Sequence, residues 1–103
     1  MGTTMLPAVH QGEILREDYM VPLGLSINKL SRDLHVPPNR ISELVNLKRG
    51  ITVDTALRLA RYLGTTPQFW LNLQVLFELE VSSQVAAKQI KSEVKPRRPS
   101  AVA

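Results

Sequence analysis

The chain has 103 residues, enough for one domain with a modest core, and its hydrophobic share of 44% is ordinary for a folded globular protein. It contains no cysteine, which excludes disulfides, thiolate metal sites and a cysteine nucleophile and fits a reducing cytoplasm. No apolar run approaches the roughly 20 residues of a membrane span, and the first residues do not resemble a signal peptide. We therefore expect a cytoplasmic protein without a membrane partner.

The net charge of +4 is unevenly distributed along the chain. Basic and acidic residues balance in residues 1–80, so the excess lies in residues 81–103. Within the balanced part, residues 26–50 carry five basic and two acidic side chains, a local surplus that phosphate contacts require. Judged by charge alone, residues 26–50 fit an ordinary solvated surface as well as they fit a DNA-contacting one.

Hydrophobic spacing and helix-ending residues predict the first elements. We expect a flexible arm over residues 1–9 and a helix from about Gln11 to Met20. Pro22 and Gly24 are expected to end this helix.

Residues 27–46 predict two short helices joined by a tight turn, which is the pattern of a helix-turn-helix. Ser26 suits the N-cap of the first helix, and His35 takes the left-handed position at the turn. Ser31 is small enough for two helices that cross closely. The apolar residues expected to join the two helices are Leu30, Leu34, Val36, Ile41, Leu44 and Val45.

The second helix of this pair is expected to begin at Pro37-Pro38, since proline suits the first helical position. In a helix-turn-helix the second helix lies in the DNA major groove, where arginine can pair with guanine and asparagine with adenine. Glu43 could accept from a cytosine amine; a solvent-facing position or an ion pair with a basic neighbour is an equal alternative to such base reading. The predicted base-reading residues are Pro38, Asn39, Arg40, Ser42 and Glu43.

Phosphate contacts fix the register of a protein on DNA and carry little sequence information. We expect them from the start of the first helix of the pair and from the basic loop 47–50 that follows the second. The predicted phosphate-contacting residues are Ser26, Asn28, Lys29, Lys48 and Arg49.

A fourth helix is predicted from its N-cap Thr52 to about Leu63, with Gly64 ending it. Its expected apolar stripe consists of Val53, Ala56, Leu57, Ala60 and Leu63.

The last helix is expected to start at Thr66-Pro67, and it is apolar on two sides. In so small a domain one side can face the core, and the other predicts a dimer interface; a core helix with some exposed leucines is the alternative. Trp70 is expected in core or interface and not in base stacking. The residues assigned to the interface or core are Phe69, Trp70, Leu71, Leu73, Val75, Leu76, Phe77 and Leu79. Residues 81–103 predict a fraying helix and a basic disordered tail.

The sequence offers little support for an enzyme. His10 and His35 are too isolated to indicate a metal site, and no nucleophile–base set or pair of carboxylates stands at a convincing spacing. We expect no catalytic residue, no metal and no cofactor.

Residues 10–80 resemble the HigA/VapI family of antitoxins, which belongs to the lambda-repressor-like, XRE-type helix-turn-helix group. The similar segments are HQGEILREDYMVPLGLS, VPPNRISELVNLKRGIT and TVDTALRLARYLGTTPQFWLNLQVLFELE. The third segment is the most specific. The chain departs from the family pattern at Ile27, where a polar residue is frequent, at Ser31, where alanine is favoured, and at His35 and Leu47, where glycine is favoured.

The resemblance implies an all-α, five-helix domain over residues 10–80 that dimerises through its C-terminal helix. It also implies a bacterial, nucleoid-associated repressor of its own operon. Its implied partners are double-stranded operator DNA, a second copy of the chain, and a RelE-like, HigB-type toxin that cleaves mRNA and is neutralised by direct binding. Two alternatives stay open: a regulator without a toxin, and a protein-masking module whose DNA surface is vestigial.

Overall fold

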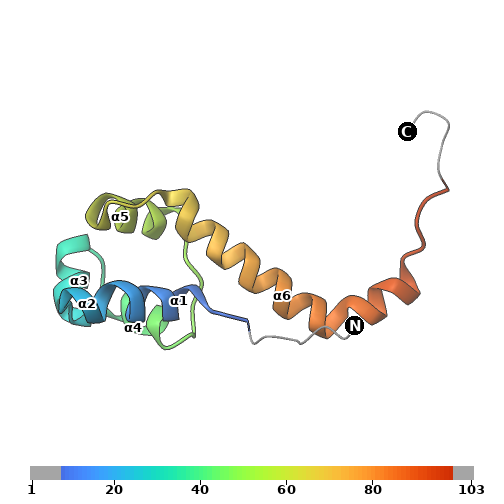
Figure 1. The fold of residues 1–103 in the computed structure, drawn as a ribbon, viewed down its shortest axis with the longest axis horizontal. Coiled ribbons are helices and arrows are strands. Elements are labelled where there is room, and N and C mark those ends of the chain that lie inside the picture. The colour runs from blue at the N-terminus through green and yellow to red at the C-terminus, as the bar shows by residue number, and fades with distance from the viewer. Residues whose placement is uncertain (1–7, 99–103) are drawn as a thin grey trace.

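The computed structural model describes residues 8–98, and all regular secondary structure in this range is helical (Figure 1). The segments α1 (Gln11–Ile14), η1 (Leu15–Met20) and α2 (Val21–Leu23) follow one another without a break and form one rod. Four further helices complete the fold: α3 (Ile27–Leu34), α4 (Pro38–Val45), α5 (Val53–Leu63) and α6 (Pro67–Glu93). The predicted all-α, five-helix fold is confirmed.

The first rod is longer than predicted, because it continues past Met20 and Pro22 to Leu23. Its middle segment η1 is a π-helix, in which the N–H of Val21 donates to the carbonyl of Arg16. A proline ring in a regular α-helix clashes with the carbonyl four residues earlier, and a wider turn before it makes room. The rod ends at Gly24, whose φ of 65° is the left-handed conformation expected of a helix-ending glycine.

The two helices of the helix-turn-helix are held as the sequence predicted. The Ser26 hydroxyl caps α3 by accepting from the N–H of Lys29 at 3.0 Å. His35 has a φ of 59° and ends α3 in the left-handed conformation. Pro37 precedes α4 in an extended conformation and makes no side-chain cap.

The core lies where α3, α4 and α5 meet the first rod and the beginning of α6. Gly12 permits the close approach of α1 to α4, since a Cβ built there would lie 1.9 Å from the carbonyl oxygen of Leu44. The buried apolar cluster comprises Leu15, Met20, Leu30, Leu34, Val36, Ile41, Leu44, Val45, Ile51, Ala56, Leu59 and Trp70.

The apolar stripe predicted for α5 is only partly correct. Val53 and Leu57 are 60% and 53% exposed, whereas Ala56, Leu59 and Ala60 are buried. The helix carries two overlapping apolar stripes, and its contacts with α3 and α6 cover one of them.

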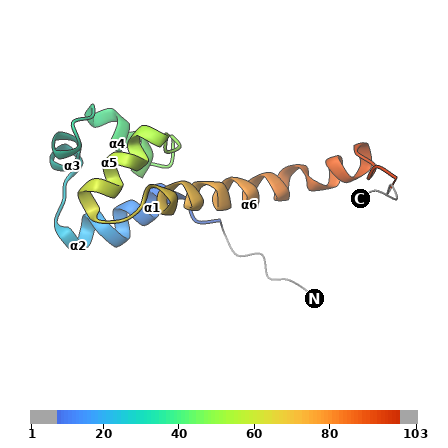
Figure 2. The ribbon, with the colours of Figure 1, turned by 90° about the horizontal axis from the view of Figure 1, so that it is seen from above.

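Helix α6 has a buried beginning and a long projecting remainder (Figures 1 and 2). Trp70 is fully buried and its indole N–H donates to the Thr65 hydroxyl at 2.7 Å, which confirms its place in the core. The helix continues to Glu93, well beyond the fraying expected after residue 80. Because this part projects, the molecule measures 55 × 33 × 22 Å.

Of the predicted arm over residues 1–9, only Ala8 and Val9 fall within the described residues. Within the part of the chain that the structure describes, no helix is long and apolar enough to cross a membrane.

Candidate nucleic-acid interface

The outer side of α4, opposite the core, presents the predicted reading residues. Ile41, Leu44 and Val45 are buried beneath the helix. Pro38 and Asn39 are exposed, while Arg40, Ser42 and Glu43 are half-buried. The five side chains therefore share the outer half of α4.

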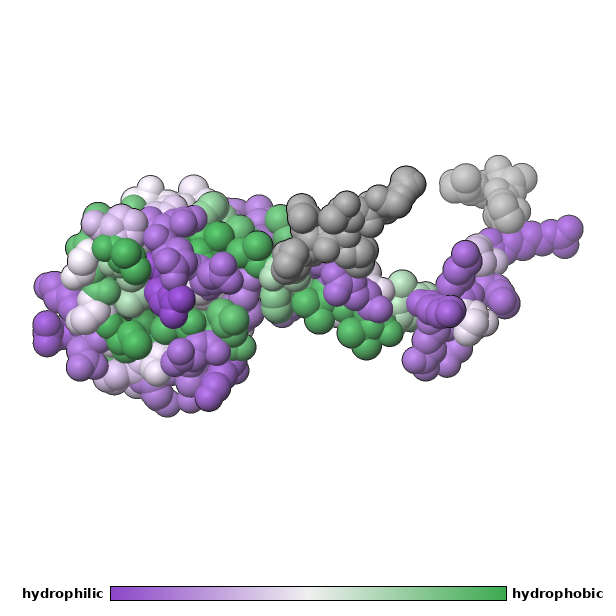
Figure 3. Space-filling model, turned by 60° about the horizontal axis from the view of Figure 1, so that its bottom comes forward, coloured by the Kyte–Doolittle hydropathy of each residue, from purple (hydrophilic) through white to green (hydrophobic). Residues whose placement is uncertain are grey.

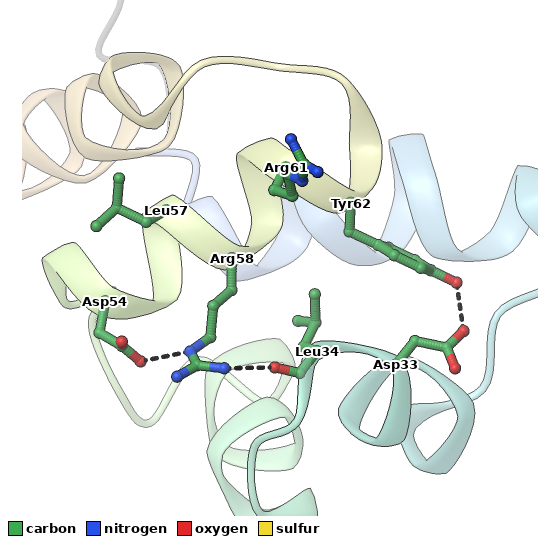
Figure 4. A pocket seen from close by; sticks show the side chains of 7 residues that line it. All are labelled: Asp33, Leu34, Asp54, Leu57, Arg58, Arg61 and Tyr62. Carbon is green, nitrogen blue, oxygen red and sulfur yellow. Dashed lines mark hydrogen bonds and ion pairs between the residues drawn. The ribbon is translucent and has the colours of Figure 1, made fainter.

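Arg40 is held by a carboxylate that the sequence analysis did not single out. Its Nη1 lies 2.9 Å from Oδ2 of Asp54, in the first turn of α5. The same Oδ2 accepts from Nε of Arg58 at 2.9 Å. Arg58 in turn donates through Nη1 to the carbonyl oxygen of Leu34 at 2.9 Å (Figure 4). A single network thus joins the first turn of α4, the start of α5 and the end of α3.

The network fixes the charge state of Asp54. The hydrogen bond from Arg58, followed by that from Arg40, lowers the pKa of the Asp54 carboxyl below its usual value. Asp54 is 54% exposed, so each ion pair is screened by water and contributes modestly to stability. The contact with Asp54 also restrains the orientation of the Arg40 side chain.

Glu43 pairs with a basic neighbour, which was one of the two readings left open. Its Oε1 lies 2.8 Å from Nη2 and 2.9 Å from Nε of Arg49, in the loop after α4. Arg49 was predicted to contact phosphate, and in this structure its guanidinium is oriented by Glu43. Lys48 is exposed on the same loop.

The basic loop owes its shape to two features. Leu47 has a φ of 64°, a left-handed conformation that leucine adopts at a cost. Beyond the loop, Ile51 is buried and its backbone N–H donates to Oε1 of Gln74 on α6, whose Nε2 donates to the Ile51 carbonyl oxygen at 3.1 Å. Gln74 also accepts from Nε2 of Gln11 at 2.8 Å.

The other predicted phosphate contacts lie at the start of α3. Ser26 uses its hydroxyl to cap the helix, and Asn28 is exposed. Lys29 pairs with Asp33 at 3.0 Å, and Asp33 also accepts from the Tyr62 hydroxyl at 2.5 Å. These hydrogen bonds, that from Tyr62 first, lower the pKa of Asp33.

An open cleft of about 560 Å³ separates the end of α3 from the outer face of α5 (Figure 4). Two of the three carboxylates that hold predicted DNA-contacting side chains, Asp33 and Asp54, stand at its edge. Its lining residues are Asp33, Leu34, Asp54, Leu57, Arg58, Arg61 and Tyr62.

Three residues important to this surface were not predicted to belong to it: Asp54, Arg58 and Gln74. The spacing of Asp54 and Arg58, four residues apart on a helix, is a sequence signal for their ion pair. Gln74 is one of several polar residues on α6, so the sequence carries no signal for its contact with Ile51.

His10 has a structural position. It is 7% exposed, caps α1 by accepting through Nδ1 from the N–H of Gly12 at 2.9 Å, and packs its ring edge-on against Phe77. Among residues 8–98, no three side chains of the metal-ligating types are grouped together.

Comparisons with known proteins agree with this architecture. The helix-turn-helix family model matches residues 16–70. Virulence-associated protein I of Dichelobacter nodosus is 53% identical over 83 residues, which cover 81% of this chain and 77% of that protein. The structure of a HigA-family addiction module antidote protein from Coxiella burnetii aligns with a TM-score of 0.83 at 43% identity, over 88% of this chain and 99% of that one. The Pseudomonas aeruginosa antitoxin HigA with the higBA promoter aligns with a TM-score of 0.85 at 37% identity, over the same shares of the two chains.

The fold and the outward-facing α4 define a DNA-binding protein of the helix-turn-helix class. Relatives of this class matched here are regulators and antitoxins and not enzymes, in agreement with the prediction. The chain belongs to the HigA/VapI family of helix-turn-helix antitoxins.

Proposed function

We propose that this protein is the antitoxin of a type II, HigBA-like toxin–antitoxin pair and represses its own operon by sequence-specific DNA binding. The observation that carries the proposal is the first turn of α4, whose outer side chains are arranged on a rigid core. Support comes from the Pseudomonas aeruginosa HigA structure with the higBA promoter, which shares the fold over most of both chains.

In the proposed complex α4 lies in the major groove. Pro38, Asn39, Arg40 and Ser42 form the base-reading set, and Glu43 acts through Arg49 as well as through its own carboxylate. Phosphates are contacted from two places, the start of α3 and the loop after α4. The phosphate set is Ser26, Asn28, Lys29, Lys48 and Arg49. Such contacts release counterions, so binding weakens steeply as salt rises.

The protein acts as a dimer in this proposal, with α6 as the shared element. Val75, Leu76 and Leu79 are 57%, 63% and 62% exposed, although they lie on a helix whose other side is partly buried. Figure 3 shows apolar surface on α6 where the helix leaves the domain. A groove of about 400 Å³ continues it, lined by Leu79, Ser82, Ser83, Ala87, Ile90 and Lys91. Phe69, Leu71, Leu73 and Phe77 are half-buried and take part from the core side.

A two-fold dimer presents two α4 helices to half-sites about one helical turn apart, roughly 34 Å. Residues 81–93 continue the same helix, and the exposed basic segment 94–98 follows it. The matching toxin is a RelE-like, HigB-type mRNA-cleaving protein, and its neutralisation requires only protein–protein contact. A surface away from α4 allows toxin and operator to bind together.

The experiment is the charge reversal Arg40→Glu, assayed for operator binding and for toxin neutralisation. Arg61→Glu is the matched control, since Arg61 is exposed on α5 and belongs to neither DNA-contacting set. We expect Arg40→Glu to abolish operator binding and to leave neutralisation intact. Unchanged operator binding in Arg40→Glu would refute the site. Loss of neutralisation by Arg40→Glu but not by Arg61→Glu would refute the separation of surfaces.

A further inference from the structure

We infer that Asp54, outside the helix-turn-helix, is a specificity-determining positioning residue that aligns the Arg40 guanidinium for a guanine in the operator. This inference rests on the proposed function, because it concerns how α4 reads DNA. It assigns a role to a carboxylate that would otherwise be expected only to repel a DNA backbone.

The geometry supports alignment rather than simple neutralisation. Asp54 contacts only the Nη1 group of Arg40, at 2.9 Å. Within residues 8–98 no hydrogen bond engages the Nε and Nη2 groups of Arg40. These two groups form a flat edge with parallel N–H bonds, the geometry that matches O6 and N7 of guanine.

Asp54 is itself held in place, as an aligning group must be. Arg58 donates to its Oδ2 at 2.9 Å and is anchored by the carbonyl oxygen of Leu34 (Figure 4). Asp54 also lies in the first turn of α5, where the Thr52 hydroxyl caps the helix. Arg58 therefore holds the carboxylate itself, and the Thr52 cap fixes the helical turn that carries Asp54.

Restraint of Arg40 matters because a free arginine binds phosphates of any sequence. Its side chain is 29% exposed, so Arg40 is confined by its surroundings and still reached by solvent. A guanidinium that is already fixed in one orientation loses less conformational freedom when it forms two parallel hydrogen bonds to a guanine. It therefore favours guanine over phosphate, because binding a phosphate requires the side chain to bend out of that orientation. Removing the Asp54 charge should therefore lower discrimination more than affinity.

The test compares Asp54→Asn with the wild-type chain on two DNA probes. One is a duplex of the protein's own upstream DNA, and the other is a scrambled duplex of equal length. Asp18→Asn is the charge-matched control, because Asp18 is exposed on the first rod, away from Arg40 in sequence and element. Thermal unfolding of each variant verifies that the domain is intact.

We expect Asp54→Asn to lower the ratio of specific to scrambled affinity about tenfold, mainly through tighter binding to the scrambled duplex. Asp18→Asn should leave the ratio unchanged. Replacing operator guanines one at a time by 7-deazaguanine, which lacks the N7 acceptor, should weaken wild-type binding at one position in each half-site. That penalty should shrink in Asp54→Asn.

Two outcomes would overturn the inference alone. In the first, Asp54→Asn binds the two duplexes just as Asp18→Asn does. In the second, Asp54→Asn binds both duplexes more tightly with an unchanged ratio of specific to scrambled affinity, which would mean that the Asp54 charge only repels DNA. If the wild-type chain does not distinguish the two duplexes at all, the proposed function fails and this inference falls with it.

Discussion

The carboxamide of Gln74 spans the backbone of Ile51, accepting from its N–H and donating to its carbonyl oxygen at 3.1 Å. Ile51 follows the loop that carries Lys48 and Arg49, and Gln74 lies on α6 directly before Val75. The loop proposed to contact phosphate is thus tied to the helix proposed to form the dimer.

Replacing Gln74 by alanine should loosen the loop. The change leaves the Ile51 N–H and carbonyl without their side-chain partner and should destabilise the domain by about 1–2 kcal/mol. Hydrogen exchange at the Ile51 amide should accelerate and operator affinity should fall, while the dimer persists. Gln68→Ala, at an exposed position of the same helix, is the control. Equal exchange rates at Ile51 in the two variants would contradict this account of the loop.

Leu47→Gly should stabilise the protein. Leu47 has a φ of 64°, and a left-handed conformation costs a non-glycine residue about 1–2 kcal/mol, part of which the greater unfolded-state freedom of glycine offsets. A net gain of about 1 kcal/mol should appear in urea denaturation. Leu57→Gly is the matched control, because Leu57 is equally exposed but helical, and there glycine should cost about 1 kcal/mol. A loss of stability in both variants would show that the loop conformation is not strained.

Ser31→Ala should also be stabilising. Ser31 is 1% exposed where α3 crosses α4, and its hydroxyl oxygen has no hydrogen-bond partner among residues 8–98. Alanine removes the buried, unpaired hydroxyl and should gain about 1 kcal/mol in the free energy of unfolding. Ser83→Ala, on exposed α6, measures the gain from helix propensity alone. The account requires the gain at Ser31 to exceed that at Ser83.

His10 should make stability depend on pH. Burial lowers the pKa of His10 from its usual 6.5, against a smaller opposite effect of Glu13, and its cap requires an unprotonated Nδ1. Above about pH 6.5 the histidine is neutral in both states and its contribution is complete. As pH falls through 6.5 towards the folded-state pKa, the unfolded chain takes up protons first and stability is lost.

The measurement is the melting temperature between pH 8 and pH 5, a range above the titration of the paired carboxyls of Asp33 and Asp54, both of whose pKa values are lowered. His10→Asn keeps a capping oxygen without a titrating group and should flatten the profile. If the melting temperature of His10→Asn falls with pH as steeply as that of the wild-type chain, His10 is excluded as the cause of the pH dependence.

Local signals in the sequence predicted most of the fold. Ser26, Thr52 and Thr66 were expected to cap helices, and each accepts from a backbone N–H three residues later. His35 was expected in the left-handed region and is found there. Each of these features depends on a few neighbouring residues, which is why sequence alone suffices to predict it.

Features that depend on how helices cross were missed. Val53 and Leu57 look like core residues by spacing, but only the packing of α5 decides which apolar stripe is covered. The Arg40–Asp54 pair joins residues 14 apart on different helices, and Gln74 reaches Ile51 across 23. No local pattern specifies either partner. The rod past Pro22 was missed because a π-helical turn leaves no clear signature in the sequence.

The central claim is sequence-specific DNA binding through the exposed turn of α4. The most direct measurement is a gel shift of the purified full chain on its own upstream DNA, against scrambled competitor at near-physiological salt. The account predicts a discrete complex that resists the competitor and is lost in Arg40→Glu. A smear that the competitor removes would contradict it and would favour a protein whose main task is to bind another protein.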